Sequence, residues 1–334
     1  MAFKTNYVQM KYGRIDSNVY YQRFIASLQN KIPHKATLVN TIADILAIDK
    51  DAVYRRLRGD VSFSFLEMSN IAKSIGISLD KIAGIENTQS RPSEMNIINH
   101  INPSEIDYEM FEEHVNIFKT IKDDPNSKIM DASNIFPYFL YYDYEYLTRY
   151  HIFRWNNVGI SGNILPYHEI SIPVRLRALQ KELCTYAKQI SSTLYILNSH
   201  IFERIVSNIK YFFRIRLINE SDVSMIKNDL MAFLNMMEKL AVTGKHRETG
   251  KEVFIYISDL ASDANYCCLK SKKDNVTIFK TFIANETVTF DVEVFNSASA
   301  WIYSIQRTST LISVSGEKFR AEYFDNQKEI ILSL

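Results

Sequence analysis

The stretch KATLVNTIADILAIDKDAVYRRLRG at residues 35–59 constrains the fold more than any other part of this chain. Apolar residues recur in it at spacings of three and four on both sides of the dipeptide Ala47-Ile48. That spacing gathers apolar side chains on one face of a helix, and the few residues between the two runs leave room only for a turn. We therefore expect two short amphipathic helices, residues 38–46 and 50–58, joined by a tight turn.

Capping and terminating residues bound these helices and their neighbours. Thr37 and Asp49 are suited to N-cap the two helices, because their side-chain oxygens can accept hydrogen bonds from free backbone N–H groups. Pro33 ends the preceding helix, and Gly59 and Gly76 end helices as glycine does at a position that needs positive φ. We expect a compact five-helix unit, whose other helices are predicted at residues 19–31, 65–75 and 78–85.

The segment at residues 19–85 resembles the helix-turn-helix domain of phage-repressor and Cro-type transcriptional regulators. The resemblance is carried by the small residue where the two helices cross, the residues that flank the turn and a β-branched residue that packs the second helix, here Ala43, Leu46, Ile48 and Val53. Ala47 stands where the family usually has a glycine with φ > 0, a conformation that costs an alanine on the order of 1 kcal/mol. The resemblance implies a DNA-binding domain at residues 1–90.

The resemblance also implies that the helix at residues 50–58 lies in the major groove of double-stranded DNA. Lys50 and Arg55 would donate hydrogen bonds to guanine O6 and N7, and Asp51 would accept one from cytosine N4. Tyr54 would stack on a base or contact a thymine methyl group. Contacts to phosphates set the register without specifying sequence, and they are expected from Lys35, Thr37, Asn40, Arg58, Ser62 and Ser64.

The charge distribution is compatible with this interpretation. Residues 1–90 contain 12 Lys and Arg against 8 Asp and Glu, whereas the whole chain has a formal net charge of only +1. A basic surplus favours binding to phosphates, because each neutralised phosphate releases condensed counterions. A solvated basic face would have the same composition. The alternative therefore stays open that the chain is a protein-interaction adaptor, with a helical bundle that does not bind DNA.

The remainder of the chain indicates a second, larger domain. Residues 91–103 are polar and contain Pro92, which predicts a linker. Residues 104–334 are predicted to be mostly helical, with a small antiparallel sheet. The predicted fold class is therefore mainly α, with a helix-turn-helix domain followed by a larger helical α+β domain for effector binding or dimerisation.

The predicted sheet lies toward the C-terminus, where the period of apolar residues changes from helical to alternating. Its strands are expected at residues 252–257, 265–270 and 276–282. The segment 287–294 alternates in a way that fits either a fourth strand or the run into a helix at residues 293–307. A last helix is expected at residues 316–332.

Two long helices are predicted before the sheet, at residues 199–217 and 220–242. Their apolar residues recur in alternating steps of three and four, which is typical of helices that pack along a seam. Because the connection between them is short, we expect an antiparallel hairpin, and a dimer interface built from the same faces is the alternative. Asn219 and Asp222 are placed to cap the second helix.

Residues 136–155 contain ten aromatic side chains in twenty positions. A thick aromatic core is the favoured explanation. The alternative is a pocket in which tyrosine hydroxyl groups orient a small-molecule or peptide effector, because ligand sites combine apolar walls with a few polar groups. The candidate residues for such an effector pocket are Tyr141, Tyr144, Tyr150 and Trp155.

Sequence motifs of enzymes are absent, since the chain has no HExxH, GxSxG, CxxC or Walker motif. Its seven histidines include no pair at i, i+3 or i, i+4 spacing, so we expect no catalysis, no cofactor and no metal. Three unpatterned cysteines and the lack of a long apolar run predict a cytoplasmic protein without membrane contact. The predicted function is that of a sequence-specific transcriptional regulator that binds double-stranded DNA as a homodimer.

Overall fold

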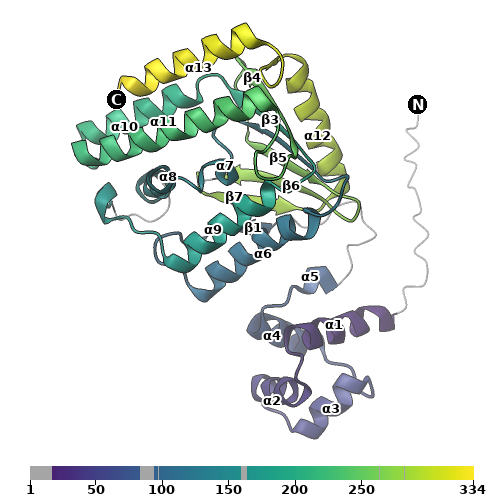
Figure 1. The fold of residues 1–334 in the computed structure, drawn as a ribbon. Helices are drawn as coiled ribbons and strands as arrows, with labels where there is room; N and C mark the ends of the chain where they lie inside the picture. The colour runs from purple at the N-terminus through teal and green to yellow at the C-terminus, as the bar shows by residue number, and fades with distance from the viewer. Residues whose placement is uncertain (1–16, 83–93, 97, 159–163, 263, 282) are drawn as a thin grey trace, which may run out of the picture. The chain divides into compact units, whose positions relative to one another are not determined.

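A computed structural model describes residues 17–82, 94–96, 98–158, 164–262, 264–281 and 283–334 (Figure 1). The chain divides into two compact units, Met1–Ser90 and Arg91–Leu334. Among the helices that the structure describes, none is long and apolar enough to cross a lipid bilayer.

The described part of the first unit is helical. Its elements are α1 Ser17–Lys31, α2 Lys35–Leu46, α3 Lys50–Arg58, α4 Phe65–Ile75 and α5 Leu79–Ile82. The apolar faces of these helices meet in one core, in which Phe24, Leu28, Ile42, Val53 and Ile71 are fully buried. The bounds predicted for α3 and α4 from apolar spacing and terminating glycines are confirmed.

The start of α2 differs from the prediction. The helix begins at Lys35, and His34 rather than Thr37 occupies the N-cap position with extended backbone angles. Thr37 lies within the first turn, where its hydroxyl oxygen is 3.1 Å from Nδ1 of His34. Asp49 does occupy the N-cap position of α3, although its side chain makes no capping hydrogen bond. Apolar spacing locates a helix more accurately than it locates the helix ends.

An eight-stranded sheet forms the centre of the second unit, as far as the structure describes it (Figure 1). Its strands are β1 Glu94–Asn96, β2 Lys128–Ser133, β3 Ser192–Asn198, β4 Glu252–Ser258, β5 Tyr266–Lys270, β6 Asn275–Thr281, β7 Asn285–Thr289 and β8 Thr310–Leu311. Their order across the sheet is β1-β7-β6-β5-β2-β3-β4-β8. The pairs β2–β3 and β3–β4 are parallel, and the other neighbours are antiparallel.

The α+β class is confirmed, but the prediction of a small antiparallel sheet was wrong. Strands are present near the three expected positions as β4, β5 and β6, yet β4 pairs in parallel with β3. The prediction missed β2, which connects the parallel and antiparallel parts of the sheet. Five of the six residues of β2 are buried. A strand covered on both faces lacks the alternation of apolar and polar residues by which strands are recognised.

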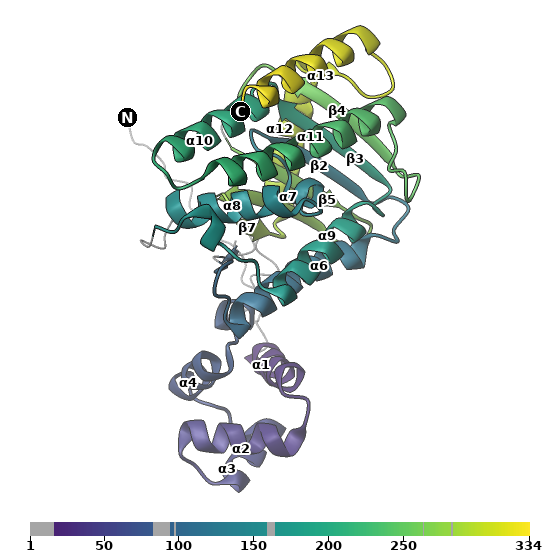
Figure 2. The same ribbon diagram turned by 60° about the vertical axis from the view of Figure 1, so that its left-hand side comes forward.

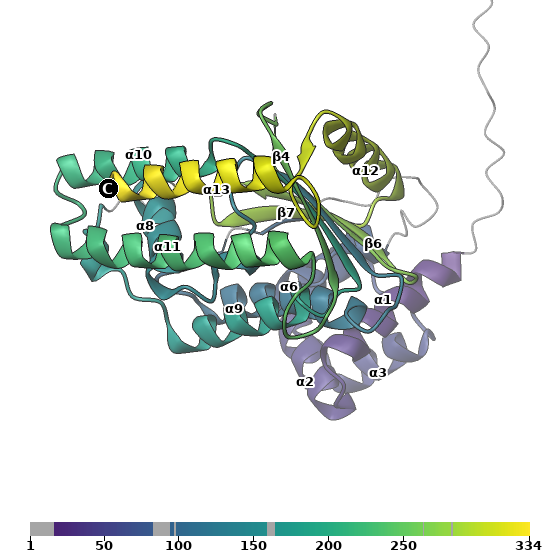
Figure 3. The same ribbon diagram turned by 45° about the horizontal axis from the view of Figure 1, so that its top comes forward.

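Helices cover both faces of this sheet (Figure 3). They are α6 Glu105–Ile121, α7 Tyr138–Tyr141, α8 Glu145–Val158, α9 Val174–Ala187, α10 Ile201–Arg214, α11 Glu220–Thr243, α12 Val292–Arg307 and α13 Glu317–Leu332, with a 3-10 turn at Tyr167–Glu169. Tyr195 and Ile255 belong to the large core that the sheet shares with α6–α11 and α13. Leu194 and Ile196 face α12 instead, where they pack with Phe295. The sheet is therefore the middle of three layers.

The helices α10 and α11 do not form the simple two-helix hairpin that was predicted. The C-terminal helix α13 packs along both of them (Figures 1 and 3). The ammonium group of Lys227 on α11 donates to the carbonyl oxygens of Leu332 and Leu334 at 2.9 and 3.0 Å. On α10, Nζ of Lys210 lies 3.0 Å from the hydroxyl oxygen of Ser333. The apolar seam is therefore completed by a third helix that is distant in the sequence.

Capping residues settle two boundaries in this unit. The predicted capping box of α11 is present, because Asn219 and Asp222 each accept a hydrogen bond from the backbone N–H of the other. In the ambiguous segment 287–294, β7 ends at Thr289 and α12 begins at Val292. Asp291 N-caps α12, so the segment contains both the end of a strand and the start of a helix.

The predicted linker at residues 91–103 contributes instead to the second unit. Its strand β1 pairs with β7, and both Ile98 and His100 are buried. The N–H of Ile98 donates to Oδ1 of Asn285 at 2.9 Å, and Nε2 of His100 lies 3.0 Å from the carbonyl oxygen of Ala284. Burial lowers the pKa of His100 to about 4. The prediction of a solvent-exposed linker from the polar composition of this segment was therefore wrong.

A buried ion pair joins β6 to the centre of the sheet. Nζ of Lys280 lies 2.6 Å from Oδ2 of Asp131, and the two side chains are only 3% and 0% exposed. The hydroxyl of Ser133 donates to Oδ1 of Asp131 at 2.5 Å, and its oxygen is 3.2 Å from Nζ of Lys280. Each charged group therefore has a partner in a region from which water is excluded.

A second cluster of buried polar side chains is centred on Glu286 of β7. Its carboxylate accepts a hydrogen bond from the hydroxyl of Tyr138 at 3.0 Å and lies 2.6 Å from Nδ1 of His114. Burial alone would raise the pKa of Glu286, but His114, Tyr138 and Lys280 together lower it below its ordinary value. His114 is thus a partnered histidine of the core.

We predict that Lys280→Met lowers the free energy of unfolding of the second unit by about 3–5 kcal/mol, because it leaves the buried carboxylate of Asp131 without its cationic partner. Replacing Asp131 by Asn in the same chain should recover most of that loss. Both tryptophans of the chain, Trp155 and Trp301, lie in this unit, so urea unfolding followed by tryptophan fluorescence measures the change. Equal stability of the single and double variants would contradict the prediction.

Candidate nucleic-acid interface

The turn after α2 holds α2 and α3 next to each other at one end of the first unit (Figure 2). Ala47 has a φ of 51° and a ψ of 46°, and its N–H donates to the carbonyl oxygen of Ala43. The N–H of Ile48 donates to the same carbonyl oxygen at 3.2 Å. The prediction that Ala47 adopts positive φ is therefore confirmed.

The two faces of α3 differ sharply in polarity. Val53 is fully buried against the core of the unit. Lys50, Asp51 and Arg55 are exposed, and Tyr54 is half-buried. Lys50 and Arg55 make no ion pair within the described part of the chain. The structure therefore leaves two cationic side chains of α3 available to a partner.

Arg56 anchors α3 to the rest of the first unit, a role that the sequence analysis missed. Its guanidinium group lies 2.9 Å from Oε1 of Glu67 on α4, and its carbonyl oxygen accepts a hydrogen bond from Tyr21 at 2.7 Å. The N–H of Ser64 donates to the same carboxylate at 2.7 Å. That bond is the main factor that lowers the pKa of Glu67; burial opposes it and Arg56 assists it. The spacing Ser64-x-x-Glu67 is a capping-box signal that could have revealed half of this arrangement.

The residues expected to contact phosphates are all exposed, but they are not equally available. Lys35, Thr37 and Asn40 lie on the first turns of α2, and Nζ of Lys35 is 5.8 Å from the centre of the Tyr54 ring on α3. The start of α2 is therefore close to the outer part of α3. His34 makes no side-chain hydrogen bond to the backbone N–H groups of that first turn.

The phosphate candidates after α3 are more constrained. Arg58 pairs with Asp60 at 3.0 Å, with both side chains largely exposed. The hydroxyl oxygen of Ser64 accepts a hydrogen bond from the N–H of Glu67 at 3.2 Å and N-caps α4. Ser62 is exposed. Arg58 would have to exchange a carboxylate for a phosphate, whereas Ser64 already has a structural role.

The aromatic residues proposed for an effector pocket are mostly packed into the core of the second unit. Tyr141, Tyr150 and Trp155 are buried, and Tyr144 is half-buried. The ring of Tyr141 stacks on His151 with centroids 4.1 Å apart. The hydroxyl of Tyr150 points to the carbonyl oxygen of Ile205 at 3.5 Å. These are contacts of the thick aromatic core, which the sequence analysis favoured over a pocket.

One protein family matches part of this chain. The family, described as the BetR domain, matches residues 18–119. The BetR domain is a helix-turn-helix-like DNA-binding domain associated with regulators. The match includes α1 to α5 and most of α6, so it extends from the first unit into the second. This similarity supports a DNA-binding regulatory role for the chain.

Comparison with the whole chain gives no further relative. No curated protein matches the sequence, and no solved structure matches the fold. Support for a nucleic-acid interface therefore comes from the geometry of α2 and α3 and from the similarity of residues 18–119 to the BetR domain.

We predict that Ala47→Gly stabilises the first unit by about 1 kcal/mol, because glycine adopts the left-handed conformation without the steric cost that alanine incurs. Ala47→Val should destabilise the same unit, since a β-branched residue is disfavoured more strongly at positive φ. Hydrogen exchange of backbone amides in α2 and α3 measures both changes. Slower exchange in the valine variant than in the glycine variant would contradict the prediction.

Proposed function

We propose that this chain is a sequence-specific transcriptional regulator of the phage-repressor or Cro type, which acts by binding rather than by catalysis. The observation that carries the proposal is the outer face of α3, where Lys50 and Arg55 are exposed and have no ionic partner in the described residues. The similarity of residues 18–119 to the BetR domain supports it. In this proposal α3 enters the major groove.

The base contacts follow from the chemistry of the exposed side chains. Arg55 has a planar guanidinium group that can donate two hydrogen bonds to guanine O6 and N7. Lys50 can donate to the same acceptors, and Asp51 can accept from cytosine N4. Tyr54, half-buried beside Lys35, can stack on a base or contact a thymine methyl group.

The phosphate contacts begin at the N-terminus of α2. The positive end of the helix dipole and the uncapped N–H groups of the first turn favour an anion there. The side chains of Lys35, Thr37 and Asn40 surround that turn and are exposed. Arg58, Ser62 and Ser64 would bind the backbone of the DNA on the other side of α3.

We predict that Arg55→Ala weakens binding to a specific operator by about 1–3 kcal/mol, equivalent to about 5- to 150-fold, and relaxes sequence preference at one base pair. The operator is obtained by selecting bound sequences from a random DNA pool, and affinity is measured by fluorescence anisotropy. Lys73→Ala is the matched control, because it removes an exposed positive charge from α4 outside the proposed interface. It should leave specific binding unchanged.

The same titrations distinguish the regulator from an adaptor. A DNA-binding protein loses affinity for random duplex DNA steeply as salt concentration rises, because it releases counterions from the phosphates it neutralises. Specific affinity that is identical in the native protein and in Arg55→Ala would overturn the assignment of Arg55. No binding to duplex DNA at low salt would overturn the regulator and favour the adaptor.

We also propose that the second unit dimerises the protein and senses a small-molecule or peptide effector. A nine-residue recognition helix reaches only a few base pairs, so two copies on half-sites about one DNA turn apart would supply the specificity that one copy lacks. The presence of a separate unit of much greater size supports a role beyond DNA contact.

We predict that the selected operators are two-fold symmetric and that two chains bind each of them. Analytical ultracentrifugation of the protein, free and mixed with operator DNA, measures this stoichiometry. A monomer in both samples would remove the dimerisation proposal but leave the DNA-contact proposal intact.

A further inference from the structure

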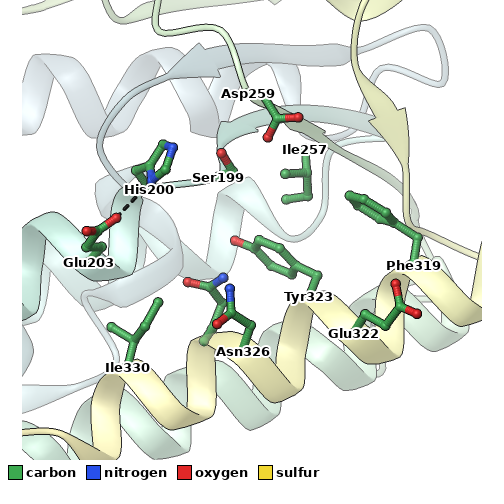
Figure 4. Close-up of a pocket in the computed structure, with 11 residues that line it drawn as sticks. Ser199, His200, Glu203, Ile257, Asp259, Phe319, Glu322, Tyr323, Asn326 and Ile330 are labelled. Atoms are coloured by element: carbon green, nitrogen blue, oxygen red, sulfur yellow. Dashed lines mark hydrogen bonds and ion pairs between the residues drawn. The ribbon is translucent and has the colours of Figure 1, made fainter.

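A cavity lies in the second unit at the carboxyl ends of two parallel strands (Figure 4). Its volume is about 540 Å³, within the range that small-molecule sites occupy. Ser199 follows the end of β3, Asp259 follows the end of β4, and α13 forms the facing wall. The carboxyl ends of parallel strands are where open α/β sheets commonly bind ligands.

The charge of this cavity is predominantly negative. Three carboxylates line it, from Glu203, Asp259 and Glu322, against the single imidazole of His200. Glu203 lies 2.8 Å from that imidazole (Figure 4). Glu322 has only a long contact of 3.8 Å with the largely exposed Lys318. Asp259 has no ionic partner among the described residues. The cavity therefore has an unpaired negative charge that a cationic ligand could neutralise.

A buried polar group in the same cavity lacks a partner. Gln327 lines the cavity on α13 and is only 2% exposed, yet its carbonyl oxygen Oε1 accepts no hydrogen bond. The hydroxyl oxygen of Ser199, across the cavity, is likewise buried and unpartnered. A buried acceptor without a donor carries a free-energy cost, because it has lost its hydrogen bonds to water. A ligand with N–H groups would remove that cost.

The remaining walls are aromatic and aliphatic. Figure 4 shows Tyr323 and Asn326 projecting from α13 toward the side on which Ser199 and Asp259 lie. Phe319 from the same helix lies beside Ile257 of β4. Such walls favour an apolar ligand body, and aromatic faces attract cations further.

We infer that this cavity binds a small primary ammonium compound with an apolar or aromatic body. The ammonium group is held by Asp259, and one of its N–H groups donates to the unpartnered hydroxyl oxygen of Ser199 on the same side of the cavity. Phe319 and Tyr323 enclose the body of the ligand. Such a compound would be the effector that the second unit is proposed to sense. Its binding does not depend on that proposal, but its role in regulation does.

Three probes that share a phenylethyl group and differ in their terminal polar group test the inference. They are 2-phenylethylamine, 2-phenylethanol and 3-phenylpropionate, each titrated into the full chain by calorimetry without DNA. The amine should bind at least about tenfold more tightly than the neutral alcohol, because a charged hydrogen bond adds to the apolar contact. The anion should bind least tightly, because Asp259 and Glu322 repel it.

Two variants locate the binding site. Asp259→Asn should weaken binding of 2-phenylethylamine by about tenfold or more, whereas Asp325→Asn, an exposed carboxylate of α13 outside the cavity, should leave it unchanged. Ser199→Ala should also weaken it, with a thermal unfolding midpoint no lower than that of the native protein as the check on folding.

Other outcomes would overturn the inference. These are binding of the alcohol or the anion as tight as that of the amine, no binding of the amine, or equal losses in Asp259→Asn and Asp325→Asn. The Arg55→Ala variant should bind the amine normally. Failure of DNA binding and failure of ligand binding are therefore measured separately.

Discussion

Parallel pairing of β2, β3 and β4 is the constraint around which the second unit is built. Parallel neighbours cannot be joined by tight hairpins and need long crossover connections. The chain therefore passes through α7–α9 between β2 and β3, and through α10 and α11 between β3 and β4. These helices bury one face of the sheet and α12 buries the other. The same pairing brings the carboxyl ends of β3 and β4 together, where the cavity beside α13 lies.

The first unit positions a helix that is too short to be stable by itself. A nine-residue helix such as α3 is marginal in water, so its orientation depends on contacts with its neighbours. Val53 fixes the inner face through the core, and Arg56 fixes the C-terminal half through Glu67 and Tyr21. Lys50 and Arg55 take no part in these contacts. The orientation of α3 is thus fixed by residues other than the exposed Lys50 and Arg55.

Charged residues serve opposite purposes in the two units. Lys50 and Arg55 on α3 are exposed and available to a partner, whereas Lys280, Asp131 and Glu286 are buried and satisfied by one another or by neighbouring side chains. Asp259 resembles the α3 residues in being exposed, but it also lines a cavity that contains the unpartnered Gln327. The burial and partners of a charged residue, and not its charge alone, therefore indicate whether it is available to a ligand.

The sequence by itself determined the helices of the first unit, apart from the start of α2, because apolar spacing and terminating residues act over a few neighbouring residues. The left-handed turn at Ala47 was expected from the resemblance to the Cro-type motif. The sequence also determined which face of α3 is polar. Only the tertiary structure decided that β2 lies at the centre of a mixed sheet, that residues 94–96 form its edge, and that α13 packs on α10 and α11. It also decided that Arg58 is paired with Asp60 and that Gln327 faces a cavity. Most of these features depend on partners far apart in the chain, and no local pattern specifies which distant segments meet.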